Sequence, residues 1–209
     1  GITEEQALPV YFKEKFNIEP AFCGVNIIGI GGQNYKTFLS LIKNFNIKWF
    51  VFSDGEDKTI RTVRKAIRDV FGVEMQTLSN VIVLDNGEDY EWHLINSGYE
   101  EEMVQAICEH EGEPEFVNKY INTRNHTSAG RERTDQPECP TCHQAIYRDI
   151  IRDYSGDEGY RQAIYDCCTS KQAKAKYAAI VAERIVSIED DTRKIPPKVA
   201  ELFEKMQPI

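Results

Sequence analysis

An apolar run that breaks abruptly into acids most constrains the fold of this 209-residue chain. Residues 49–52, Trp-Phe-Val-Phe, are followed at once by Asp54, Glu56 and Asp57. Four consecutive apolar residues suit a strand that is covered on both faces, as in a parallel sheet flanked by helices. Ligands bind at the carboxyl ends of strands in open α/β sheets, so these acids would face a ligand crevice. A simple polar turn explains the same acids equally well.

Two further apolar segments predict strands, and helices are expected between them. The segments are Val25–Ile30 and Asn80–Leu84, and the second again runs into acids that include Asp89 and Glu91. Alternation of strands with helices is the βαβ pattern, which predicts a parallel sheet with helical crossovers. The expected helices span Thr3–Phe16, Tyr35–Asn44 and Lys58–Arg68, with Thr3 and Gln6 spaced as a capping box.

The chain changes character near Ser97, where strand patterns give way to helical ones. We therefore expect a catalytic core over residues 1–96 and a helical extension over residues 97–209. A polar segment, Asn122–Glu138, is expected to be a loop. The predicted helices of the extension lie near Glu101–His110, Glu115–Tyr120, His143–Tyr154, Tyr160–Thr169 and Ala173–Val186.

The net charge and the apolar pattern of the chain limit the classes of protein to which it could belong. The net charge of −9 argues against a protein that coats nucleic acid by bulk electrostatics, although it permits a metal-dependent enzyme that acts on phosphates. Five basic residues between Lys58 and Arg68 form either a solvated helix face or a surface for a nucleic-acid backbone. No apolar run approaches the roughly 20 residues of a membrane span, and Glu4 and Glu5 do not suit a signal peptide. We expect a cytoplasmic protein with no membrane partner.

Six cysteines are too few and too irregular for a disulfide scaffold in a chain of this length. Cys139 and Cys142 have the spacing of a zinc knuckle, and Cys167 and Cys168 follow later in the chain. Cys139 and Cys142, with Cys167 or Cys168 and with His143, could supply the four ligands of a structural zinc ion. Buried free thiols are the competing interpretation.

Several short motifs resemble, in order, those of the Toprim domain of OLD (overcoming lysogenization defect) family nucleases. Gly1–Pro9 is similar to the first motif, Asp54-x-Glu56 stands where the family has Asp-x-Asp, and Glu88–Leu94 is similar to a later motif. A Gly31-Gly32 turn also fits, and the sequence around Lys174 resembles a lysine-bearing C-terminal helix of the family. The resemblance implies a Toprim-like parallel sheet flanked by helices, followed by a mainly helical C-terminal region.

The resemblance also implies an activity, namely metal-dependent cleavage of DNA in defence against phage, beside an N-terminal ABC-type ATPase domain. Phosphodiester hydrolysis of this kind uses two Mg²⁺ or Mn²⁺ ions. Lys174 would stabilise negative charge on the phosphate. Besides Lys174, the implied catalytic residues are Glu4, Asp54, Glu56 and Glu91, and the implied metal ligands are Glu4, Asp54, Glu56, Asp89 and Glu91.

This chain departs from the family pattern at two positions. The family's first catalytic glutamate would lie directly before Gly1, so we expect further sequence upstream. Glu56 replaces an aspartate, and Asp57 is a competing candidate. Two alternatives follow: a nucleic-acid-binding or assembly module that serves an ATPase partner, or another Toprim phosphotransfer enzyme. No G-x-x-x-x-G-K-[ST] motif occurs, so the sequence contains no phosphate-binding loop of its own.

Overall fold

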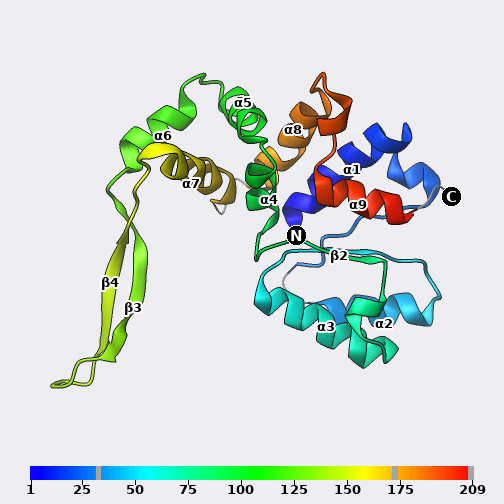
Figure 1. The fold of residues 1–209 in the computed structure, drawn as a ribbon, viewed down its shortest axis with the longest axis horizontal. Helices are drawn as coiled ribbons and strands as arrows, with labels where there is room; N and C mark the ends of the chain where they lie inside the picture. Colours follow the sequence, from blue (N-terminus) through cyan, green and yellow to red (C-terminus); the bar gives the residue numbers. More distant parts are fainter. Residues whose placement is uncertain (32–33, 171–173, 207–209) are drawn as a thin grey trace.

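A short parallel sheet lies between two groups of helices (Figure 1). The computed structural model describes residues 1–31, 34–170 and 174–206. Gly32 of the predicted turn and Ala173 lie outside these ranges. The helices are α1 (Ile2–Phe16), α2 (Tyr35–Asn44), α3 (Asp57–Phe71), α4 (Tyr90–Asn96), α5 (Glu100–Glu111), α6 (Phe116–Arg124), α7 (Gly156–Thr169), α8 (Lys174–Val186) and α9 (Pro197–Met206). The strands are β1 (Val51–Ser53), β2 (Val81–Val83), β3 (Ser128–Glu138) and β4 (Ala145–Ile151).

The predicted parallel pairing of the second and third strand segments is confirmed. Strands β1 and β2 are parallel, with Phe52 opposite Ile82, and α3 lies in the connection between them. Side chains alternate across a strand. Val51 and Val81 accordingly contact the small core that α2 and α3 form, while Phe52 and Ile82 contact the main core on the other face. The mixed α/β fold class is therefore the expected one.

The main core joins α1 to helices from the other end of the chain. Leu8, Tyr11 and Phe12 of α1 are buried in it, together with residues of α4, α5, α7, α8 and α9. The Phe12 ring meets that of Phe203 edge to face, with the centroids 5.7 Å apart. Burying one such apolar side chain stabilises a fold by roughly 1.5–3 kcal/mol. Residues on both sides of residue 96 thus contribute to one core.

The prediction of a strand at Val25–Ile30 is wrong, because the structure shows no strand pairing there. Val25 and Ile27 pack on the main core, and Ile30 packs on the small one. The segment runs past the start of α1, where a Cβ on Gly29 would lie 2.9 Å from the Gly1 carbonyl oxygen. Val25, Ile27 and Ile30 are thus partly buried without strand pairing, whereas Ile28 is 58% exposed.

Helix α2 forms as predicted. Its buried residues are Tyr35 and Leu39, one turn apart, whereas Leu41 and the following Phe45 are 52% and 69% exposed. The hydroxyls of Tyr35 and Ser53 lie within 2.9 Å of each other. This hydrogen bond to the end of β1 sets the rotation of α2 on the sheet.

The loop predicted at Asn122–Glu138 and the helix predicted at His143–Tyr154 are both wrong, because the two segments form the β3–β4 hairpin. Cross-strand charges stabilise it: Arg131 lies opposite Asp149, with Nε 3.0 Å from Oδ1, and Glu132 pairs with Arg148. The hairpin projects from the body of the molecule (Figure 1). No helix among the described residues is long and apolar enough to cross a membrane.

Candidate functional site

Gly55 brings the loops after β1 and β2 into contact. Its backbone N–H donates to the Glu88 carbonyl oxygen at 2.8 Å, and a Cβ at this position would lie 2.3 Å from the Leu84 carbonyl oxygen. Only a glycine allows so close an approach of the two backbones. As a result, Asp54 at the end of β1 lies next to the acids that follow β2.

Asp89 and Glu91 are held by side chains from distant parts of the chain. Asp89 caps α4, where one carboxylate oxygen accepts from the Trp92 N–H at 3.0 Å, and the other accepts from the Tyr165 hydroxyl at 2.7 Å. Glu91 is only 4% exposed and accepts from the Thr3 hydroxyl at 2.9 Å. The predicted capping role of Thr3 is therefore wrong, since its hydroxyl contacts Glu91 and no side chain caps α1.

Glu4, on helix α1, lies near Asp54 as well. Its side chain is buried, and Oε2 lies 2.9 Å from the N-terminal amine. Burial and the nearby Glu4 carboxylate raise the pKa of Asp54 from 3.8 to about 7, with smaller contributions from Asp89 and Glu91. The pKa of Tyr165 is also raised, by burial, by its hydrogen bond to Asp89, and by the charges of Glu91 and Glu56.

These mutual effects define a carboxylate cluster that combines side chains from α1, β1, the start of α3 and α4. Its acids influence one another's ionisation or that of the tyrosine that contacts them, as expected when like charges share a partly buried site. Glu56 and its competing candidate Asp57 are both exposed, at the N-cap and in the first turn of α3. The members of the carboxylate cluster are Glu4, Asp54, Glu56, Asp89 and Glu91.

The donor chemistry of the carboxylate cluster fits a hard divalent cation. Mg²⁺ and Mn²⁺ prefer carboxylate oxygens, and a cation would relieve the repulsion that raises the pKa of Asp54. Within the described ranges, however, no three Asp, Glu, His or Cys side chains lie in an arrangement that could hold a metal ion. Two of the acids, Glu91 and Asp89, accept hydrogen bonds from Thr3 and Tyr165.

Comparison with known proteins agrees with the motifs. Residues 1–55, which include Glu4 and Asp54, match the family model of the overcoming lysogenization defect protein-like TOPRIM domain. The resemblance to the OLD-like TOPRIM domain is confirmed. Two structures of the C-terminal region of the Xanthomonas campestris pv. campestris OLD protein, phased with platinum and with mercury, superpose with TM-scores of 0.58 and 0.59. They are 17% and 18% identical in sequence, with 98% of this chain and 87% and 89% of theirs covered. No curated protein sequence matches the chain.

The OLD-like TOPRIM match over residues 1–55 suggests a module of the nuclease and phosphotransfer type. Strand β1, which delivers Asp54, ends inside the matched residues, while α4 and the acids Asp89 and Glu91 lie beyond them. The structural likeness extends over nearly the whole chain and so includes the helices that carry Tyr165 and Lys174. Low sequence identity limits that likeness to the fold.

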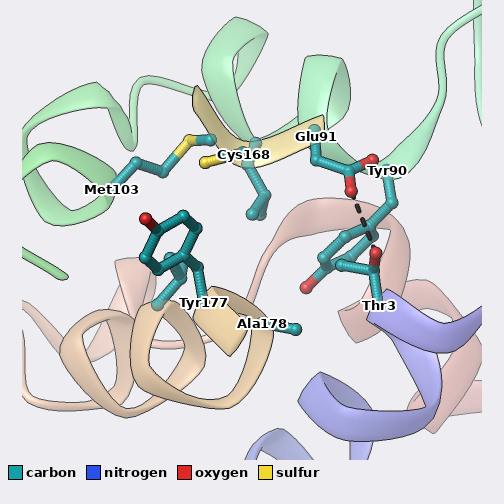
Figure 2. Close-up of a pocket in the computed structure, with 9 residues that line it drawn as sticks. Thr3, Tyr90, Glu91, Met103, Cys168, Tyr177 and Ala178 are labelled. Atoms are coloured by element: carbon teal, nitrogen blue, oxygen red, sulfur yellow. Dashed lines mark hydrogen bonds between the residues drawn. The ribbon is translucent and has the colours of Figure 1, made fainter. Parts of the chain in front are cut away.

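Helix α8 begins at Lys174, whose side chain is outside the described part of the structure. Tyr177 and Ala178, in the first turns of α8, line a cavity of about 20 Å³ beside Thr3 and Glu91 (Figure 2). The first turns of α8 therefore lie beside Thr3 and Glu91 (Figure 2). A cavity of this size holds about one water molecule.

The two cysteine pairs predicted to share a zinc ion lie in different parts of the molecule. Cys139 and Cys142 are at the tip of the β3–β4 hairpin, whereas Cys167 and Cys168 are buried in the main core on α7. Hydrogen bonding from the backbone of Cys142 and Thr141 lowers the pKa of the Cys139 thiol. Burial raises the pKa of the Cys167 thiol to about 12. The structure thus does not assemble the predicted set of zinc ligands, because the hairpin carries its tip away from α7 (Figure 1).

Sequence reasoning missed the groups that orient the acids. Tyr165 was assigned only to a helix, and Thr3 to a helix cap. Tyr35, whose pKa is raised by burial and by the charges of Asp54 and Glu4, contacts no acid directly: its hydroxyl pairs with that of Ser53, beside Asp54. Each acts through a residue far away in the sequence, so no local pattern indicates its function.

Proposed function

We propose that the chain is the catalytic part of a metal-dependent DNA endonuclease of the OLD type. The observation that carries this proposal is the position of Asp54, whose carboxyl group lies within electrostatic reach of Glu4, Asp89 and Glu91. Partly buried acids destabilise one another unless protons or cations neutralise them. A cluster of this kind at the carboxyl end of a parallel sheet suits an enzyme that binds divalent ions and a phosphate.

In this proposal the five members of the carboxylate cluster would hold two Mg²⁺ or Mn²⁺ ions. Bound ions of this type activate a water molecule and neutralise charge on a phosphodiester. Tyr165 orients Asp89 and Thr3 orients Glu91, so that their carboxylates are positioned by the helical core. Lys174, at the start of α8, would stabilise negative charge on the phosphate or the leaving oxygen.

The basic residues of α3 would contact the DNA backbone. Helix α3 starts three residues after Asp54 and buries Val63 and Ile67 against the small core. Lys58, Arg61 and Lys65 are exposed on it. Basic side chains beside a phosphate-binding centre position a strand without reading its sequence. An N-terminal ABC-type ATPase domain, in the same protein or in a partner chain, and a role in defence against phage belong to the same proposal.

A second candidate function is a nucleic-acid-binding or assembly module that serves an ATPase partner without cleaving DNA. The absence of a ready metal-holding group among the described side chains favours it. Another Toprim phosphotransfer reaction would use the same acids, and only the substrate would distinguish it.

Nicking of supercoiled plasmid DNA separates these functions. The protein should carry a glutamate directly before Gly1, as the family motif does, and should be assayed with Mg²⁺, with Mn²⁺ and with chelator. We expect metal-dependent nicking that Asp54→Asn reduces by at least about 100-fold, since a metal ligand is lost. The control Glu204→Gln removes one carboxylate from an exposed position of α9 and should nick normally. Undiminished nicking by Asp54→Asn would eliminate this site.

A further inference from the structure

The tip of the β3–β4 hairpin presents two cysteines outside the body of the protein. The last strand pair, Glu138 with Ala145, closes a six-residue loop with the sequence Cys-Pro-Thr-Cys-His-Gln. Cys142 is exposed and Cys139 is half-buried within the loop, and both are free thiols. Each is therefore accessible to a metal ion from solvent.

The loop has the backbone of a metal-binding knuckle. The Cys139 N–H donates to the Gln144 carbonyl oxygen at 2.8 Å, and the His143 N–H donates to the Cys139 carbonyl oxygen at 2.9 Å. His143 directly follows the second cysteine in the left-handed conformation, with φ of 57°, which turns the chain back into β4.

One such loop supplies only half of a structural metal site. Zinc held by thiolates takes four ligands in a tetrahedron. In the described part of the chain, no third cysteine, histidine or carboxylate joins Cys139 and Cys142 to form a metal-holding group. The other adjacent pair, Cys167 and Cys168, is 4% exposed at each residue and belongs to the main core. The missing ligands must therefore come from outside the hairpin.

We propose that Cys139 and Cys142 form half of a tetrahedral zinc site, and that the same two residues of a second copy of this chain complete it. Two copies related by a twofold axis present identical knuckles, so one ion receives four thiolates. The hairpin projects from the body of the molecule (Figure 1), so two such tips would meet at a distance from the two bodies. This inference is independent of the proposed nuclease activity.

Zinc content and mass, measured together on the whole chain, test the proposal. Protein purified with zinc under reducing conditions should contain one zinc ion per two chains by elemental analysis and should be a dimer by light scattering. Chelation should convert the dimer to monomer, and added zinc should restore it. The double variant Cys139→Ser/Cys142→Ser should be monomeric and free of zinc, and the control Cys23→Ser should behave as the wild type.

Three outcomes would overturn the proposal. A monomer with one zinc ion per chain would mean that a single copy completes the site. A zinc-free wild type would exclude the metal. A dimer that persists in the double cysteine variant would place the contact elsewhere. Both substituted positions are in an outer loop, and an unchanged thermal midpoint of the variant would exclude misfolding as the cause of any loss.

Discussion

The Tyr165 hydroxyl donates a 2.7 Å hydrogen bond to Asp89 and so connects α7 to the carboxylate cluster at the edge of the sheet. The rings of Trp92 and Tyr165 stack with centroids 5.0 Å apart, which fixes the direction of the hydroxyl. The backbone N–H of Trp92 donates to the other carboxylate oxygen of Asp89. Two residues that pack on each other thus orient one acid.

Tyr165→Phe is expected to release Asp89 while keeping the ring stack. A hydrogen bond to a charged group contributes about 1.5–3 kcal/mol, so the free energy of unfolding in urea should fall by up to that amount. If Asp89 holds a metal ion, losing the group that orients it should weaken Mn²⁺ binding about 10- to 100-fold in calorimetric titrations. The control Tyr160→Phe changes a partly exposed residue of the same helix. Unchanged Mn²⁺ affinity in Tyr165→Phe would contradict the orienting role.

Asp54 should make stability fall as pH rises from about 4 to about 7. Its pKa is raised in the folded state, from 3.8 to about 7, so the folded protein binds the proton more tightly than the unfolded chain. The stabilisation is complete below the unfolded pKa and is lost as pH rises through the folded one. The free energy of unfolding of Asp54→Asn should therefore equal that of the wild type near pH 4. At pH 8 it should exceed the wild-type value by about 1–3 kcal/mol, after allowance for solvent screening.

The same variant tests whether the carboxylate cluster binds metal. At pH 8, Mg²⁺ should raise the thermal midpoint of the wild type, because a ligand that binds only the folded state stabilises it. The thermal midpoint of Asp54→Asn should rise less with Mg²⁺ than that of the wild type. An equal response of both proteins would show that the ions bind elsewhere.

Local sequence patterns predicted the part of the site that the sheet positions. Buried apolar runs marked β1 and β2, and the acids after them had to meet because the carboxyl ends of parallel neighbours share one edge. Glu4 joined them through the family motif. The helical phase of α1 does bury Glu4 with Leu8 and Tyr11, one and two turns further along the same face.

Long-range partners explain what the sequence did not reveal. The sequence position of Thr3 is typical of a helix cap. In the structure its hydroxyl donates instead to Glu91, which is 88 residues away in the chain. The hairpin lacks apolar alternation because most of its side chains are exposed, and its register depends on charge pairs such as Arg131 with Asp149. Patterns that report burial cannot detect a strand that is exposed on both faces.

Gly55→Ala should strongly destabilise the protein, since the added methyl group would lie 2.3 Å from the Leu84 carbonyl oxygen. The loops after β1 and β2 would have to separate, and we expect a loss of more than about 3 kcal/mol in the free energy of unfolding. Gly112→Ala is the matched control. Gly112 has φ of +68° and open space around it, so only the left-handed backbone penalty of about 1–2 kcal/mol applies. Similar losses in both variants would argue against close contact of the two loops.

Thr3→Val should destabilise the fold through Glu91. Valine keeps the branched shape of threonine but removes one donor to a carboxylate that is 4% exposed, and losing a hydrogen bond to a buried charged group costs about 1–3 kcal/mol. Thr3→Ser keeps the hydroxyl and should lose less than about 1 kcal/mol, because only one methyl group is removed. Urea denaturation at pH 7 measures both. Equal losses in the two variants would assign the role of Thr3 to packing in the cavity it shares with Tyr177, whereas a loss confined to the valine variant would identify the hydroxyl as the group that positions Glu91.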